Sequence, residues 1–282
     1  MQRLKRERNY ETFFMIVIAV ILVITMFIVG TEYMLQKDEV RVALQMNKQY
    51  LFKEDADTLY NQLAQKYSGN PKMVMMLNEY EEYPQELKEL ALRNEDAISY
   101  VQGYKYKTDE VDNDLSELDT SKVAVLMQWD RRWGYATYGN EMFGLTGCGP
   151  TVLSMAAIYL SGNTEMTPYR VSQMSMDKGY YINHVGSSWS LMDAGAAQLG
   201  LRSSALYLHE ESMLKALENG SLIVASLGPG DFTNAGHFIL IVGVNETGEF
   251  IIRDPNSYIR TEKTWSFETL QKQILGMWRL SK

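Results

Sequence analysis

The stretch Leu145-Thr146-Gly147-Cys148-Gly149-Pro150-Thr151 holds the single cysteine of the chain and leads into a helical pattern. Apolar residues recur at helical spacing over 152–160, until Ser161-Gly162 ends the pattern. Pro150 suits the first turn of a helix, where its missing N–H costs nothing. The spacing therefore predicts a helix that begins at or next to Cys148.

A cysteine at a helix start can be chemical or structural. The positive end of the helix dipole and the free N–H groups there favour a thiolate, which is the nucleophilic form of the side chain. Gly147 and Gly149 would let a substrate backbone come close. The alternative is that Cys148 is a small buried hydrophobic residue, the common fate of a free cysteine. Partner residues elsewhere in the sequence have to decide between the two.

Composition narrows the classes of function. The chain has 282 residues, of which 46% are hydrophobic and 22% charged, as in ordinary globular proteins. Its 27 basic and 35 acidic residues give a net charge of −8, and no basic cluster follows the first dozen residues. We therefore expect no nucleic-acid partner. One cysteine excludes an internal disulfide framework and a Cys-rich zinc site, and nothing in the sequence calls for a metal or an organic cofactor.

The N-terminus carries a basic flank followed by an apolar run. Residues 1–11 are rich in Lys and Arg, and residues 12–31 contain no charge. At about 1.5 Å per residue such a run can cross a hydrocarbon core of about 30 Å. We predict a single transmembrane anchor with a cytoplasmic tail, and with everything after Glu32 outside the cell. The alternatives are a cleaved signal peptide, although no small-x-small cleavage site is visible, and a buried core helix.

Residues 32–121 are polar, acidic and rich in helix formers. Three stretches with helical apolar spacing predict three or four short helices, with breaks at Asn70-Pro71 and Tyr83-Pro84. The acidic stretch 108–121 is typical of a linker. This region is expected to be either a spacer or a helical platform for the domain that follows, residues 122–282.

That last domain opens with a short apolar stretch, Val123 to Leu126, which we expect to be a strand. Gln128 follows it. A glutamine amide is a neutral donor that can stabilise a developing oxyanion beside a cysteine nucleophile, together with the N–H of the cysteine itself. The alternative is an ordinary turn glutamine.

Between the cysteine helix and the C-terminal strands, the pattern predicts helices over 168–176 and 190–199. The loop 180–189 between them contains Ser187 and Ser188. These two serines are candidates to line a substrate groove, or else simple turn residues.

Three apolar runs predict strands over 222–227, 237–244 and 249–253, the last two joined by a tight turn. If Val244 faces Glu249, then His237 lies opposite Asn256, with Asp254 on the diagonal. A histidine at the mouth of a strand then has a group to hold its tautomer, with Asp254 preferred and Asn256 in reserve. The alternative is a buried strand end followed by a turn.

The order Cys148, His237, Asp254 along the chain is the one that thiolate–imidazolium catalysis requires. Gly236, next to the histidine, would admit a ligand. Catalysis therefore explains the lone cysteine better than burial does.

Five motifs together resemble the peptidase-like domain of the bacteriocin-processing, double-glycine cysteine peptidases. They are Gln128-Trp129-Asp130-Arg131-Arg132-Trp133-Gly134, Gly147-Cys148-Gly149-Pro150-Thr151, Gly228-Pro229-Gly230-Asp231-Phe232-Thr233, Gly236-His237-Phe238 and Asp254-Pro255-Asn256. The resemblance covers about residues 122–282. It implies an α+β, papain-like fold, in which a helix bearing Cys148 packs on an antiparallel sheet bearing His237 and Asp254. It also places Gln128 at the oxyanion site.

The predicted protein is a bacterial, single-pass membrane-anchored cysteine peptidase with its C-terminal domain outside the cell. Its expected partners are a peptide or protein substrate and, through the one N-terminal helix, the membrane. The alternatives are a papain-like amidase that acts on cell-wall peptides, and a catalytically inactive domain that binds peptides or proteins. The chain lacks the peptide-transporter domain and ATPase motif of the best-known relatives, and the sequence leaves the substrate and the oligomeric state open.

Overall fold

A computed structural model describes residues 58–282 of the chain. Residues 66–282 form one compact unit, and the described residues before them belong to another. Within residues 58–282 no helix is long and apolar enough to cross a bilayer. The predicted anchor, residues 12–31, and the cytoplasmic tail before it lie outside the described residues.

Short helices occupy the region before the last domain, as predicted. Asn70 caps the helix that starts at Pro71, because its side chain accepts the N–H of Lys72. The breaks at Pro71 and Pro84 are also found where expected. These elements are α2 (Thr58–Lys66), α3 (Pro71–Asn78), η1 (Tyr80–Glu82), α4 (Gln85–Arg93), η2 (Glu95–Ala97), α5 (Ile98–Gly103) and η3 (Tyr104–Tyr106).

The stretch 108–121 forms no helix or strand, but it does more than link. Its Leu115 is buried in the core of the domain that follows. The stretch 123–126, predicted as a strand, pairs with none of the described strands. Instead, a side chain bonds to it: the Nε of Arg253 donates a hydrogen bond to the carbonyl of Val123 at 3.2 Å.

The helix predicted around the cysteine is α7 (Cys148–Ser161), and it begins at Cys148. Gly162 ends it in the left-handed conformation, with φ 76°. The predicted helix over 190–199 is in fact η4 (Trp189–Leu191) and α9 (Ala194–Gln198), interrupted at Asp193. The other helices are α6 (Phe143–Thr146), α8 (Pro168–Asp177), α10 (Glu210–Glu218), α11 (Tyr258–Thr261) and α12 (Phe267–Gln271).

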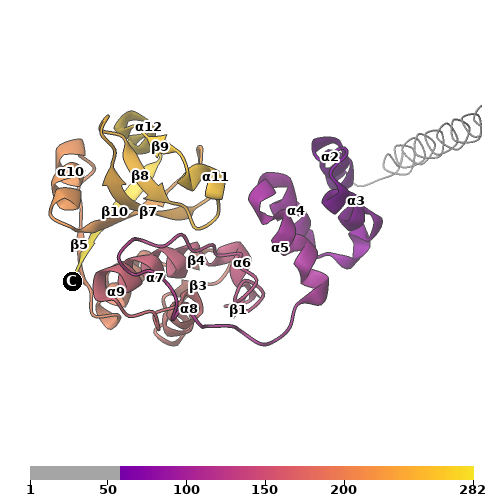
Figure 1. Cartoon of the computed structure of the whole chain (residues 1–282), viewed down its shortest axis with the longest axis horizontal. Helices are drawn as coiled ribbons and strands as arrows, with labels where there is room; N and C mark the ends of the chain where they lie inside the picture. The colour runs from indigo at the N-terminus through magenta and orange to yellow at the C-terminus, as the bar shows by residue number, and fades with distance from the viewer. Residues whose placement is uncertain (1–57) are drawn as a thin grey trace, which may run out of the picture. The chain divides into compact units, whose positions relative to one another are not determined.

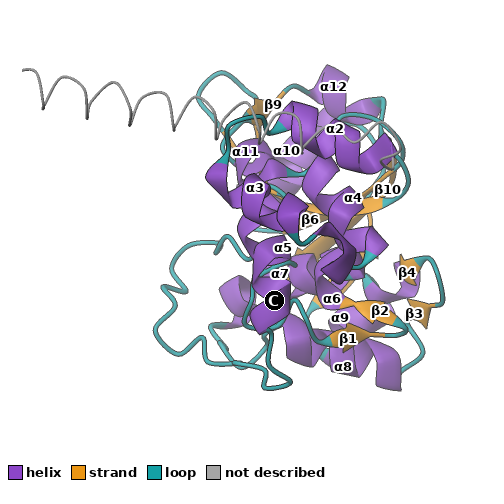
Figure 2. Ribbon diagram, turned by 90° about the vertical axis from the view of Figure 1, so that its right-hand side faces the viewer, coloured by secondary structure: helices purple, strands orange, loops and turns teal. Residues whose placement is uncertain are grey.

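Among the described residues, six strands form one antiparallel sheet in the order β5-β10-β6-β7-β8-β9. They are β5 (Arg202–Ala205), β6 (Leu222–Leu227), β7 (His237–Val244), β8 (Phe250–Arg253), β9 (Thr264–Trp265) and β10 (Ile274–Ser281). Two small hairpins lie outside this sheet and are labelled in Figure 2. In one, β1 (Thr137–Tyr138) pairs with β2 (Glu141–Met142), and in the other, β3 (Tyr181–Ile182) pairs with β4 (Gly186–Ser187).

The large sheet is covered on both faces. On one face Val224 and Leu240 pack in a core with α7 and α8. On the other face Ile223 and Ile239 pack in a second core with α10 and α12. Figure 1 shows α7 and α9 on one side of these strands and α10 and α12 on the other. Because both faces are buried, β6 reads as a continuous apolar run rather than as an alternation.

The hairpin of β7 and β8 has a different register from the predicted one at its turn. Val244 pairs with Phe250, not with Glu249, and a bulge between Ile241 and Gly243 absorbs the difference. Beyond the bulge Leu240 pairs with Arg253, which is the predicted alignment. The end of the hairpin that carries the histidine is therefore aligned as expected, although the pairing predicted next to the turn is wrong.

Candidate active site

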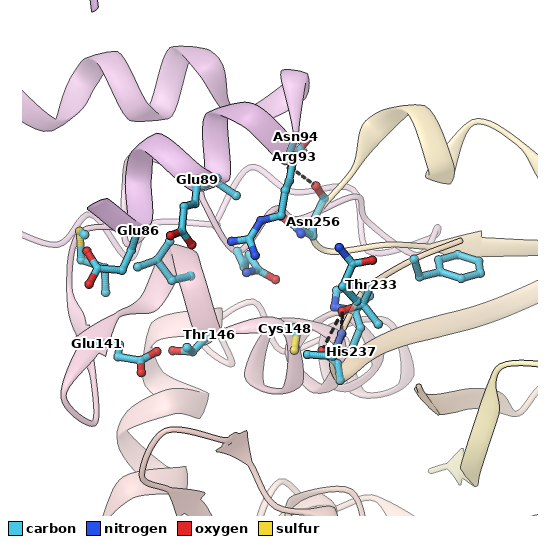
Figure 3. Close-up of a pocket in the computed structure, with 18 of the residues that line it drawn as sticks. Glu86, Glu89, Arg93, Asn94, Glu141, Thr146, Cys148, Thr233, His237 and Asn256 are labelled. Atoms are coloured by element: carbon cyan, nitrogen blue, oxygen red, sulfur yellow. Dashed lines mark hydrogen bonds between the residues drawn. The ribbon is translucent and has the colours of Figure 1, made fainter. Parts of the chain in front are cut away.

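Cys148 is the first residue of α7 and lines a cleft of about 770 Å³. The next ten residues of α7 are buried, which fixes the helix against the sheet, whereas the cysteine itself is only half-buried. His237, the first residue of β7, lines the same cleft. Figure 3 shows the sulfur and the imidazole side by side. The fold thus brings a helix terminus and a strand terminus to one point.

His237 is held by a buried carboxylate. Its Nε2 lies 2.8 Å from Oδ1 of Asp254, which has no exposed surface. Cys148 lies beside His237 in the cleft (Figure 3), and since Nε2 is taken by the carboxylate, Nδ1 is the ring nitrogen left to serve the sulfur. The three residues predicted from their chain order therefore form a continuous line, sulfur to imidazole to carboxylate.

The charges of this line stabilise one another. Burial lowers the pKa of His237, but the negative charge of Asp254 and the hydrogen bonds to Asp254 and Cys148 outweigh burial and raise the pKa from 6.5 to about 10. Burial likewise raises the pKa of Asp254, but the positive charges of His237 and Arg260 hold it below its usual value. At neutral pH the pair is therefore imidazolium and carboxylate.

Asp254 and Asn256 were the two candidates to orient the histidine, and they have different partners. Asn256 donates its backbone N–H to Oδ1 of Asp254 at 2.8 Å, while its side chain faces Asn94, 3.1 Å away. Among the described contacts the partner of His237 is Asp254. On its other oxygen Asp254 accepts the Nε–H of Arg260 at 2.5 Å.

Gln128 lies in the cleft wall and is 2% exposed. Its Nε2 donates to the carbonyl of Gly144 at 3.0 Å, and its Oε1 has no hydrogen-bond partner among the described residues. An amide nitrogen carries two hydrogens, so the bond to Gly144 uses one N–H of Gln128 and leaves the other. The backbone of Gln128 is tied to the carbonyl of Pro255 at 2.8 Å, which joins this wall to the Asp254 loop.

The predicted substrate-contacting residues divide into two groups. Gly236 lines the cleft, and a Cβ there would meet nothing within 4 Å. Gly149 instead faces Ser187, whose Oγ would lie 2.3 Å from an added Cβ, so this glycine is needed for packing. Gly147 faces Phe143 in the same way. Neither Gly147 nor Gly149 is among the residues that line the cleft, so substrate contact by these two glycines stays a prediction.

The two serines that were candidates to line a substrate groove also lie away from the cleft. Ser187 is buried and shares a hydrogen bond of 2.8 Å with the hydroxyl of Tyr138. Neither Ser187 nor Ser188 is among the residues that line the cleft. Both serve the β3–β4 hairpin and the turn after it, which was the alternative considered from sequence.

One wall of the cleft comes from a segment in which the sequence indicated no site. α4 and the residue after it contribute Glu86, Glu89, Arg93 and Asn94, which Figure 3 shows on the side of the cleft opposite α7. The loop 230–236 between β6 and β7 forms another part of the wall. No sequence signal marked the α4 residues, because acidic helical residues usually form a solvated face. Among the described residues, no cluster of His, Cys, Asp or Glu is arranged to hold a metal ion.

Comparison with known families identifies the domain that carries this site. The model of the Peptidase_C39 like family matches residues 120–282, more than half of the chain. The chain belongs to the Peptidase_C39 like family. The family points to a cysteine peptidase and to a papain-like α+β fold, in agreement with the helix and antiparallel sheet described above. The matched residues include Gln128, Cys148, His237 and Asp254 but not α4.

Comparison with solved structures returns a chain described as a C39-like peptidase from Bacillus anthracis. It is 15% identical, with a TM-score of 0.35, and the match covers 57% of this chain and 96% of that one. Comparison with curated protein sequences gives no match. The assignment to the Peptidase_C39 like family therefore stands on the family model.

Proposed function

We propose that this protein is a membrane-anchored cysteine peptidase that hydrolyses peptide bonds outside the cell, with Cys148 as nucleophile. The observation that supports this most is the arrangement in the cleft: Cys148 lies beside His237 (Figure 3), and His237 is bonded at 2.8 Å to the buried Asp254. A structural cysteine has no need of a charged imidazole and a buried carboxylate behind it.

In the acylation step the Cys148 thiolate attacks the peptide carbonyl, which forms a C–S bond and places a negative charge on the carbonyl oxygen. The free N–H of Gln128 and the backbone N–H of Cys148 donate to that oxygen; the first N–H groups of a helix have no acceptor within it. Collapse breaks the C–N bond, and the His237 imidazolium gives its proton to the leaving amine. The product is a thioester with neutral His237.

In the deacylation step a water molecule attacks the thioester while neutral His237 takes its proton. The C–S bond breaks, the carboxylic acid product leaves, and the thiolate–imidazolium pair is restored. Asp254 keeps Nε2 bonded through both steps, so that Nδ1 faces the reacting atoms. The residues of this chain supply every group that the two steps require.

The test is hydrolysis by the full-length protein, solubilised in a mild detergent, on peptide libraries and on purified cell wall. Cleavage of peptides that is lost in Cys148→Ala supports the proposal. Release of fragments from cell wall alone would assign the papain-like amidase reaction instead. A failure to cleave either, with Cys148 no more reactive than a simple thiol toward iodoacetamide, would overturn the peptidase and leave a binding domain.

Location has a test of its own, which uses the single cysteine. A membrane-impermeant maleimide added to intact cells should label Cys148 if the domain lies outside. Labelling only after the cells are broken would overturn the proposed orientation.

A further inference from the structure

The Asp254 loop is held from outside the Peptidase_C39 like domain. This loop, residues 254–261, follows β8, includes the short helix α11 and carries both Asp254 and Arg260. Its outside contacts come from the turn between α4 and α5, residues 94–97, which lies before the matched residues 120–282. The turn makes four hydrogen bonds to the loop, two from Asn94 and two to Asp96.

Asp96 makes the contacts that reach furthest toward the site. Its Oδ2 accepts the hydroxyl hydrogen of Ser257 at 2.8 Å and the backbone N–H of Ile259 at 3.2 Å. A serine hydroxyl has one hydrogen to donate, so the bond to Asp96 turns the lone pairs of Ser257 the other way. Those lone pairs accept the backbone N–H of Arg260 at 3.1 Å, which caps α11.

Arg260 passes this placement on to the reacting groups. Its Nε donates to Oδ2 of Asp254 at 2.5 Å, and Oδ1 of Asp254 lies 2.8 Å from Nε2 of His237. Cys148 lies on the other side of this line, beside His237 in the cleft (Figure 3). An unbroken chain of short contacts thus runs from Asp96 through Ser257, Arg260 and Asp254 to His237.

We propose that Asp96 is a positioning residue for the thiol–imidazole pair, acting through Ser257 and Arg260 on Asp254, so that the turn 94–97 is part of the active enzyme. This inference rests on the proposed peptidase function for its kinetic consequence. It gives the helical region before the Peptidase_C39 like domain a role that its sequence did not indicate.

The variants are chosen to separate position from charge. Asp96→Ala removes both acceptor contacts, whereas Asp96→Asn removes the charge but keeps an oxygen that can accept them. Glu95→Ala, in the exposed neighbour, is the matched control for loss of one surface charge on the same turn. Ser257→Ala breaks the same chain from the side of the loop and serves if Asp96→Ala fails to fold.

The readout is the titration of His237 in the full-length protein, followed by NMR, which is practical because the chain has three histidines. In Asp96→Ala and in Ser257→Ala the midpoint should fall by about one pH unit, because a displaced Arg260 no longer holds Asp254 against the imidazole. The double variant should fall no further than either single one. With a cleaved peptide, kcat should drop on the order of tenfold with KM unchanged. Asp96→Asn and Glu95→Ala should behave as the wild type.

A wild-type midpoint in folded Asp96→Ala or Ser257→Ala would overturn the proposal. So would a fall in Asp96→Asn equal to that in Asp96→Ala, because charge rather than position would then be the cause, or an equal fall in Glu95→Ala. The titration needs no substrate. If no peptide is cleaved but the midpoint moves as stated, the peptidase reaction fails while the positioning role stands.

Discussion

The elements that carry Cys148 and Asp254 are held in different ways. α7 presents Cys148 from the end of a helix whose next ten residues are buried, so it is fixed by apolar packing. Asp254 lies in irregular backbone at the start of the 254–261 loop and is fixed by hydrogen bonds to Arg260 and Thr261 of the same loop. Asn256 and Ser257 bond the loop to residues 94–97. A helix fixed by apolar packing is little affected when one polar contact is lost, whereas every hydrogen bond contributes to holding the loop in place. We therefore expect changes at the buried residues of α7 to affect stability and changes in the loop to affect the charge state of the site.

The largest effect is expected from Cys148→Ala. It removes the nucleophile, so peptide hydrolysis should fall by roughly 10⁴-fold or more, the scale on which loss of a covalent nucleophile acts. The half-buried side chain contributes little packing, so the melting temperature should stay close to that of the wild type. Steady-state hydrolysis and thermal unfolding check the two parts. Hydrolysis that persists in this variant would show that α7 does not supply the reacting group.

Asp254→Asn should come next, with a loss on the order of 10²-fold or more in kcat, the scale on which general acid–base catalysis contributes. It removes the main charge that raises the pKa of His237 against the effect of burial, so this pKa should fall well below about 10. Since the imidazolium is the proton donor, the alkaline limb of the pH–rate profile should move to lower pH. Asp177→Asn, an exposed carboxylate at the end of α8, is the matched control and should leave the profile unchanged.

The same pair makes the stability of the wild type depend on pH. Because the pKa of His237 is raised on folding, its contribution is complete below about pH 6.5 and is lost as the pH rises toward 10. Melting temperatures measured across this range should fall in the wild type and stay flatter in Asp254→Asn. Equal slopes would mean that the loop does not control the charge of the histidine.

A third change tests the packing of α7. Leu153 is completely buried in the core between α7 and the sheet, so Leu153→Ala should cost about 3 kcal/mol in the free energy of unfolding. The titration of His237 in the folded fraction should not move. Leu275→Ala, at a leucine that is 64% exposed, is the control and should cost less than about 0.5 kcal/mol. Denaturant unfolding measures both.

The smallest effect is expected from Asn94→Ala. It removes the side-chain contacts to the carbonyl and amide oxygens of Asn256, and that carbonyl keeps the indole N–H of Trp129 at 3.1 Å. A loss of about 1 kcal/mol in stability follows. Hydrogen exchange of the loop amides should rise, while exchange in α7 stays the same. Faster exchange in both would mean that the loop and α7 are not held independently.

The contrast also explains how much the sequence could predict. α7 follows from local signals, namely helical apolar spacing, Pro150 in its first turn and Gly162 at its end. The strands that carry His237 and precede Asp254 follow from apolar runs and a turn. Even for this hairpin the predicted pairing of Val244 is wrong, because a bulge in a sheet leaves no mark in a pattern of apolar residues.

The rest of the site depends on contacts between distant segments. Nothing local to Asp96 indicates that it bonds Ser257, and nothing local to Arg260 indicates that it bonds the carboxylate beside the histidine. Gly149 stands beside the cysteine, where a glycine could let a substrate come close, but an added Cβ there would meet Ser187 of the β3–β4 hairpin. The extent to which 32–121 and 122–282 are separate domains stays a prediction.

The most direct test of the central claim compares the rate of Cys148 alkylation by iodoacetamide in the full-length wild type and in His237→Ala at about pH 6, where a simple thiol is almost unreactive. A thiolate held by the charged imidazole predicts a wild-type rate at least about tenfold above that of His237→Ala. Equal rates in the two folded proteins would contradict the account, because Cys148 would then gain nothing from the histidine beside it.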